Sequence, residues 1–147
     1  MPQQFPYLKD LVPASKTVTF TGASTLGLAG TNTTWFTVTG TVLIVYLVPV
    51  CTVDLGEAAP TATITLGVTD NTAFFNAATN SVDIDAGDLW FDATPTEVNA
   101  LAVPAGFKEV AIIDDDIVSA CATQNTNAGA IRLDCYWLPL SPGATLV

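Results

Sequence analysis

The stretch VTGTVLIVYLVPVC, Val38–Cys51, decides the fold. A helix that crosses a bilayer needs about 20 apolar residues, and a shorter apolar run belongs more often to a protein core. Threonines precede this run, Asp54 follows it, and most of Val42–Val48 is β-branched or aromatic, which favours a strand. We therefore expect one long strand, Thr37–Val48, whose second half is buried on both faces. A strand buried by another subunit is the alternative that we keep, ahead of a membrane role.

The chain has the length of one domain and carries little charge. Its 147 residues are 50% hydrophobic and 12% charged, about half of the ~25% charged residues of a typical domain. Uncharged polar residues must therefore cover much of the surface, and a large uncharged surface usually contacts another molecule. We expect a subunit of an assembly.

The charge balance argues against a nucleic-acid partner. The chain has 4 basic and 14 acidic residues and a formal net charge of −10. Nucleic-acid binding depends on Lys and Arg side chains at the phosphates, and here the basic residues are scattered as Lys9, Lys16, Lys108 and Arg132. The acidic excess suits a basic partner surface instead.

The three cysteines do not form a recognisable framework. Cys51, Cys121 and Cys135 lack metal-site spacing, and the chain has no histidine. An odd number of cysteines, with no signal-peptide pattern in MPQQFPYLKDL, argues against disulfides. We expect buried free thiols and a protein that is made in a reducing cytosol.

Short apolar segments with turn residues every 8–12 residues predict an all-β fold. We expect a single-domain antiparallel β-sandwich or β-barrel, jelly-roll-like, over residues 16–147. Ala130–Leu140 alternates, with Ile131, Leu133, Cys135 and Trp137 on one face. The segments Gly22–Asn32, Asp54–Pro60 and Gln124–Gly129 are typical of loops and turns. A helix is expected only as one short turn near Thr94–Leu101.

The first fifteen residues predict an extended N-terminal arm. Three prolines oppose both helix interiors and ladder positions there. The arm nevertheless carries apolar side chains that would be a liability if exposed, so we expect them to bind a neighbouring molecule. These candidate partner-binding residues are Phe5, Tyr7, Leu8, Leu11 and Val12.

The residue types argue against an enzyme. Without histidine, a Ser-His-Asp or Cys-His arrangement cannot form within this chain. Paired carboxylates could still act in catalysis, from Asp83–Asp92 or Asp114–Asp116. Aspartates are common in turns because they bond the local backbone, and we favour that interpretation for both groups.

A bound cation is the weaker alternative for the same aspartates. Asp83, Asp85 and Asp88 place carboxylates near Gly87, but the spacing departs from the EF-hand loop. We expect no cofactor and no metal, and keep these three as weak candidates. The run Asp114–Asp116 has two further alternatives, a cation or contact with a basic partner residue.

Several blocks resemble small structural, head-associated virion proteins of tailed bacteriophages. The similarity spans about Lys16 to Gly143, and its blocks are strand and turn signatures without catalytic residues. The blocks are TFTGASTLGL (Thr19–Leu28), FTVTGTVLI (Phe36–Ile44), VCTVDL (Val50–Leu55), DIDAGDLWFDATP (Asp83–Pro95) and CYWLPLSPG (Cys135–Gly143).

The resemblance implies a virion component, assembled in the host cytoplasm. We expect a capsid decoration (cement) subunit that binds the major capsid protein and other virion proteins, as a homotrimer, with the arm as a clamp and Val42–Val48 near the trimer axis. The alternatives are a head-fibre or tail-associated module for a receptor or glycan, with Trp90 and Tyr136 as stacking residues, or a tail or connector subunit. Trp137 lies on an apolar face and is expected in the core.

Overall fold

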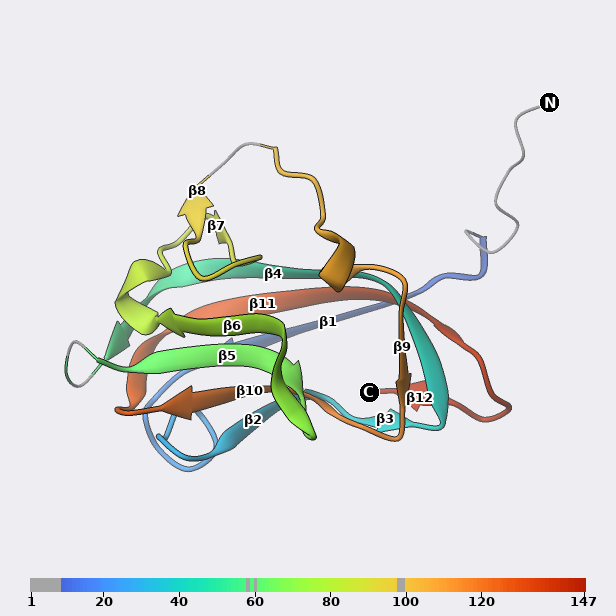
Figure 1. Ribbon diagram of the computed structural model, residues 1–147, viewed down its shortest axis with the longest axis horizontal. Coiled ribbons are helices and arrows are strands. Elements are labelled where there is room, and N and C mark those ends of the chain that lie inside the picture. The colour runs from blue at the N-terminus through green and yellow to red at the C-terminus, as the bar shows by residue number, and fades with distance from the viewer. Residues whose placement is uncertain (1–8, 58, 60, 98–99) are drawn as a thin grey trace.

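The structure, a computed structural model, describes residues 9–57, 59, 61–97 and 100–147. Strands dominate, joined by loops and short 3₁₀ helices, as the sequence predicts (Figure 1). The strands are β1 (Val12–Thr19), β2 (Asn32–Phe36), β3 (Val38–Thr39), β4 (Thr41–Glu57), β5 (Thr63–Val68), β6 (Asn71–Asn80), β7 (Asp88–Leu89), β8 (Thr96–Glu97), β9 (Val110–Ile113), β10 (Ile117–Ala122), β11 (Thr126–Pro139) and β12 (Thr145–Leu146). The 3₁₀ helices are η2 (Ser81–Asp83) and η3 (Ala105–Phe107).

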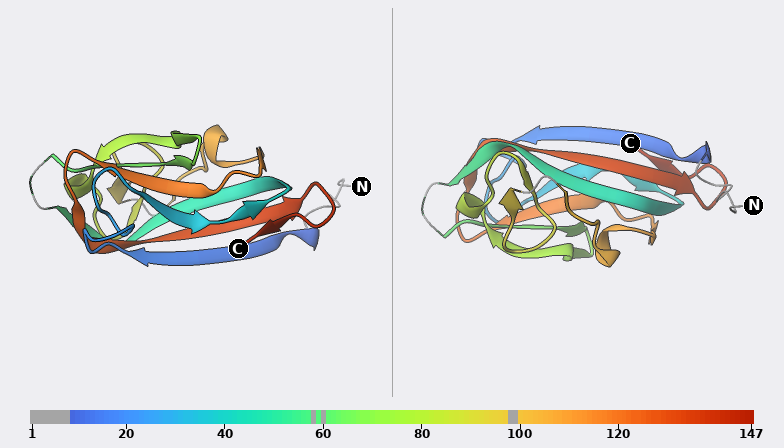
Figure 2. Two further views of the ribbon diagram at one scale, coloured as in Figure 1. Left: turned by 90° about the horizontal axis from the view of Figure 1, so that it is seen from below. Right: turned by 90° about the horizontal axis from the view of Figure 1, so that it is seen from above.

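Two antiparallel sheets stack as the layers of a β-sandwich. The first has the strand order β1-β11-β4-β7-β8, with β9 also paired to β4, and the second has the order β2-β10-β5-β6. The short strands β12 and β3 form a separate pair. The edge-on views of Figure 2 show β1, β11 and β4 in one layer and β5 and β6 in the other. The antiparallel sandwich predicted from the sequence is confirmed.

The core fills the space between the layers. Alternate residues of each strand point inward, and fully burying one large apolar side chain contributes about 1.5–3 kcal/mol. Phe107 holds η3 against the sandwich, with its ring centroid 4.9 Å from that of Phe91 and 5.7 Å from that of Phe75. The largest fully buried side chains include Phe20, Trp35, Ile44, Leu47, Ile64, Leu66, Trp90, Ile131 and Leu133.

The decisive stretch forms strand, but its boundaries differ from the prediction. Gly40 adopts a φ of +70°, a conformation that costs glycine little, and it separates β3 from β4. The strand β4 then continues through the expected loop Asp54–Pro60 as far as Glu57. Among the described residues no helix is long and apolar enough to span a membrane.

Burial of β4 on both faces is wrong within the single chain. The inward side chains of Val42, Ile44 and Leu47 are fully buried. On the other face Tyr46 is 39% exposed, and Val48 is half-buried. The sheet covers one face of β4 with the second layer and leaves the other face to solvent.

The alternation predicted for β11 is confirmed. Ile131, Leu133, Cys135 and Trp137 all lie in the core. The strand begins earlier than expected, at Thr126, so that most of the turn expected over Gln124–Gly129 is strand. Shifts of register against β4 near Ala128 accommodate the turn-like sequence inside a paired strand.

Two further boundaries are corrected. No helical turn forms in the described part of Thr94–Leu101, because Thr96 and Glu97 are extended and pair with β7 as β8. The strand β1 begins at Val12 and pairs with β11 from its first residue. The last four residues of the expected arm, Val12–Ser15, therefore belong to the first sheet.

Candidate interaction surface

The solvent side of the first sheet forms a broad face, which we call the outer face. Strand register places its side chains on one side, because partners in an antiparallel ladder point the same way. The outward side chains of β1, β11, β4, β7 and β9 define it: Pro13, Ser15, Thr17, Leu43, Tyr46, Val48, Val50, Leu89, Ala111, Arg132, Asp134, Tyr136 and Leu138.

Two tyrosines lie near the middle of the outer face. Tyr46 of β4 and Tyr136 of β11 are register partners and are 39% and 45% exposed. Val48 and Leu138 flank them and are half-buried. Tyrosines offer a large apolar ring with a polar end and are common in protein interfaces. The central part of the outer face is thus apolar and aromatic.

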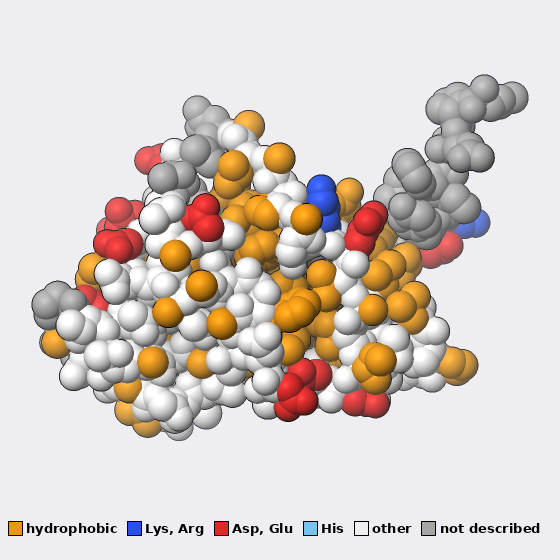
Figure 3. Space-filling view, viewed as in Figure 1, with side chains coloured by type: hydrophobic (Ala, Val, Ile, Leu, Met, Phe, Trp, Pro, Cys, Tyr) orange, Lys and Arg blue, Asp and Glu red, His pale blue; other side chains and the backbone are white. Residues whose placement is uncertain are grey.

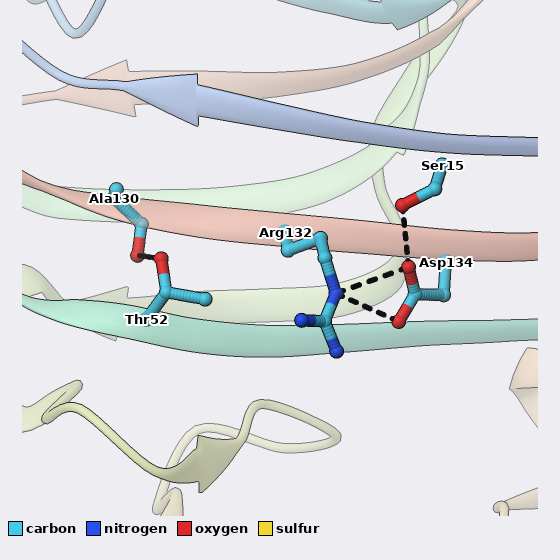
Figure 4. A network of polar contacts seen from close by, with 5 residues as sticks. All are labelled: Ser15, Thr52, Ala130, Arg132 and Asp134. Carbon is cyan, nitrogen blue, oxygen red and sulfur yellow. Dashed lines mark hydrogen bonds and ion pairs between the residues drawn. The ribbon is translucent and has the colours of Figure 1, made fainter.

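One polar network crosses this face between β1 and β11. The Arg132 guanidinium donates through Nε to both carboxylate oxygens of Asp134, at 3.1 and 2.9 Å. Ser15 Oγ donates to the same carboxylate at 2.6 Å (Figure 4). An exposed ion pair of this kind stabilises a fold by about 0–1 kcal/mol, so it contributes more to the charge pattern than to stability.

A shallow hollow lies beside this network. It has a volume of about 530 Å³, and its walls combine apolar side chains with the Arg132–Asp134 pair. The remaining walls come from Pro13, Ala14, Ser15, Val48, Cys135 and Tyr136. A hollow open to solvent suits contact with another protein surface better than enclosure of a small molecule.

The other layer presents a different surface (Figure 3). Hydrophobic atoms appear there among many uncharged polar ones, together with small groups of acidic side chains. Phe74 of β6, 47% exposed, and Ile113 of β9 in the first sheet, 66% exposed, together line a smaller hollow of about 280 Å³ with Asp115.

The run Asp114–Asp116 holds three loops through their backbone amides. Asp114 Oδ1 accepts from the Gly40 N–H at 2.5 Å, and Asp116 Oδ1 accepts from the Val38 N–H at 3.0 Å. Asp115 Oδ1 accepts from the Thr69 N–H at 2.9 Å. Backbone N–H groups stabilise the carboxylates, which explains how three adjacent acids coexist. Turn residues are therefore the supported interpretation.

The weak metal candidates also act in a turn. Asp88 Oδ2 accepts from the Asp85 N–H at 2.9 Å, while Asp83 and Asp85 are exposed. Asp54 joins them by accepting from the Ala86 N–H at 2.7 Å. In the described part of the chain, no three acidic or thiol side chains gather as a metal-holding group.

The tryptophans lie in the core and leave no indole for stacking. Trp35 and Trp90 are fully buried, and Trp137 is 7% exposed. Trp90 also donates from Nε1 to Thr79 Oγ1 at 2.9 Å. The expected stacking role of Trp90 is therefore wrong, whereas Tyr136 is exposed as expected. The sequence did not single out Tyr46, because its exposure follows from the register with β11.

Burial makes the three thiols poor nucleophiles. All of them are free and buried, as predicted. Burial raises the pKa of Cys135 to about 12 and that of Cys51 to about 11. Burial also raises the pKa of Cys121. At neutral pH these thiols stay protonated and unreactive.

Some of the candidate partner-binding residues of the arm belong to the described part of the chain and others do not. Phe5, Tyr7 and Leu8 lie outside the described residues. Leu11 is half-buried just before β1, and Val12, the first residue of β1, is 38% exposed. Their partner-binding role stays a prediction.

Fold and surface together define an all-β sandwich with an exposed, largely uncharged sheet face. No protein-family model, curated protein or solved structure matches the chain.

Proposed function

We propose that this chain is a virion structural protein of a tailed bacteriophage, in particular a capsid decoration subunit that binds the major capsid protein and stabilises the head. The outer face is the observation that supports this proposal most directly. It exposes Tyr46 and Tyr136 in an apolar centre, which suits contact with protein. The sequence blocks that resemble head-associated proteins agree with it.

The composition supports a subunit that gains stability from contacts. With only 12% charged residues, the chain covers much of its surface with uncharged side chains, and a large uncharged surface usually contacts another molecule. Closed rotational assemblies, such as the homotrimer that we include in the proposal, bury such surface on every copy. Burial on a capsid then stabilises both partners by mass action.

Binding to capsids tests the proposal. Purified protein is mixed with empty heads assembled from the major capsid protein of the same genome, and bound protein is separated by sedimentation. We expect saturable binding and heads that resist heat better once decorated. Absence of binding at protein concentrations up to about 100 µM, a weak affinity for an interface, would overturn the decoration role.

The arm is tested by a truncation that spares the sheet. Deleting residues 1–10 keeps all β1–β11 partners, whereas deleting residues 1–15 removes Val12–Ser15, which pair with Asp134–Trp137. We expect the shorter deletion to fold and to bind heads at least tenfold more weakly than the full chain. Equal head binding by full and shortened chains would exclude a clamp. The longer deletion is expected to unfold at a much lower urea concentration, because Trp137 loses its strand partner Val12 at the edge of the sheet.

A receptor- or glycan-binding module of a head fibre or tail is the second candidate. The exposed pair Tyr46 and Tyr136 favours it, since aromatic faces stack on sugars, although buried Trp90 weakens it. Binding on a glycan array that is lost in Tyr136→Ala would support this candidate. A sixfold or twelvefold ring would favour a tail or connector subunit instead.

A further inference from the structure

The outer face is nearly free of net charge on a strongly acidic chain. The formal net charge is −10, so two copies repel unless they meet where charge is absent or balanced. In β1, in β11 and in β4 as far as Thr52, the outward charged side chains are Arg132 and Asp134. These two side chains pair with each other. Two copies that meet through this face therefore bring no net charge into contact and can exchange one pair of opposite charges.

The edge of the same sheet is protected against pairing. β1 ends the sheet, and an open edge can add a strand from another chain. Pro13 removes one N–H from β1, and Lys16 places a charge on its inward side, where the Nζ donates to the Thr34 carbonyl at 3.1 Å. Proline and inward lysine are devices that block edge-to-edge pairing. Association at the β1 side of this sheet therefore uses the face of the sheet and not its edge.

Arg132 keeps donors free for a second carboxylate. Its guanidinium bonds Asp134 through Nε (Figure 4), and its two Nη groups make no hydrogen bond or ion pair with the described residues. The Asp134 carboxylate is 29% exposed and Arg132 is 44% exposed. Arginine frequently binds a carboxylate through two parallel N–H groups. Each copy therefore offers another copy both a donor, the Arg132 guanidinium, and an acceptor, the Asp134 carboxylate.

We propose that the outer face docks on the outer face of a second copy of this chain, with Arg132 of each copy bonded to Asp134 of another and the tyrosines Tyr46 and Tyr136 packed between them. The contact goes beyond the proposed function and joins two copies of the free chain. The same face lies on both sides of this contact, so exchange of the Arg132–Asp134 bonds closes with two copies across a twofold axis.

The size of the face sets the expected strength. Four strands about 4.8 Å apart, over about seven residues of about 3.3 Å each, cover about 19 by 23 Å. Two such faces bury on the order of 1,000 Å², below the ~1,200–2,000 Å² of stable complexes. We therefore expect reversible association in the micromolar range or weaker, which a capsid lattice would strengthen.

Sedimentation equilibrium of the full chain, from about 1 µM to about 1 mM, tests the association. We expect the mass to rise with concentration from one copy toward two. A mass of one copy throughout would overturn the proposal.

Charge reversals test the surface itself. Arg132→Asp makes the pair doubly acidic and Asp134→Arg makes it doubly basic, so each variant alone repels its own copies. We expect each to weaken association at least tenfold. The matched controls are Lys108→Asp and Asp83→Lys, exposed residues outside the outer face with the same changes of charge, and we expect these to change association less than threefold.

Mixing the two variants separates contacts between copies from the pair within one copy. An acidic copy and a basic copy complement each other only across the interface, so an equimolar mixture is expected to regain association as pairs of one acidic and one basic copy. Failure of the mixture to associate while both variants remain folded by circular dichroism would refute the exchange. Head binding by a monomeric chain would refute this contact and leave the decoration role standing.

Discussion

Gly129 shows at the residue scale why β11 can cross so close to β4. Its φ is +93°, and a Cβ there would press against the Asp54 carbonyl oxygen and lie 2.6 Å from the Leu55 Cα. Gly30 has a similar φ of +79° with open space around it. We expect Gly30→Ala to lower the free energy of unfolding by about 1 kcal/mol, from backbone strain, and Gly129→Ala by about 3 kcal/mol or more, since a clash adds to that strain. Equal urea midpoints for the two variants would contradict the close approach.

The buried thiols give the fold a dependence on alkaline pH. Burial raises the pKa of Cys135 from 9.0 to about 12 and that of Cys51 to about 11. Above pH 9 the unfolded chain therefore loses these protons while the folded chain keeps them, and the free energy of unfolding falls as the pH rises. The slope approaches about 1.4 kcal/mol per pH unit for each thiol. The stabilisation from these two thiols is fully present below pH 9, and it is lost as the pH rises through their pKa values in the folded chain.

Urea titrations from about pH 8 to about pH 11 measure this slope. Cys135→Ala removes one of the two strongly shifted groups, so its stability should fall less steeply than that of the native sequence, although the variant starts lower because of the cavity. Parallel slopes would show that Cys135 ionises in the folded chain.

At the scale of the element, β1 is an edge strand whose protection depends on Lys16. Its side chain shares the inward face with Leu133 and reaches the Thr34 carbonyl of β2. Replacing it with valine completes an apolar inward stripe and removes the charge that opposes edge pairing. We expect Lys16→Val to form large aggregates, seen by light scattering during a week at about 25 °C, whereas Lys108→Val loses the same charge and stays dispersed. Aggregation of both variants would point to net charge instead.

Element types were predictable from this sequence because alternation and β-branched residues report directly on sheet burial. The inward residues of β11 and the buried cysteines followed from that pattern. Boundaries were less accessible, because the turn-like Gln124–Gly129 enters β11 once β4 supplies partners. The helical turn near Thr94–Leu101 failed for a similar reason, since pairing with β7 outweighs a local preference in Thr96–Glu97.

The candidate surface was less predictable than the fold. The exposure of Tyr136 followed from alternation in β11, but Tyr46 joins it only through the register of β4 against β11. The Arg132–Asp134 pair could be anticipated from its spacing of two on one strand, yet the link to Ser15 needs the pairing of β1. Contacts between strands distant in sequence are properties of the assembled sheet.

For the whole molecule, net charge decides how association responds to salt. Two bodies of formal charge −10 held about 30 Å apart repel by about 3 kcal/mol in about 20 mM salt and by under about 0.5 kcal/mol in about 150 mM salt. Two exposed ion pairs contribute at most about 1 kcal/mol each. Added salt therefore weakens the repulsion between the two copies by more than it weakens the ion pairs between them. Sedimentation should therefore show at least tenfold tighter association at about 150 mM than at about 20 mM salt. The opposite trend would mean that the exchanged Arg132–Asp134 contacts, and not the apolar centre around Tyr46 and Tyr136, dominate the binding energy.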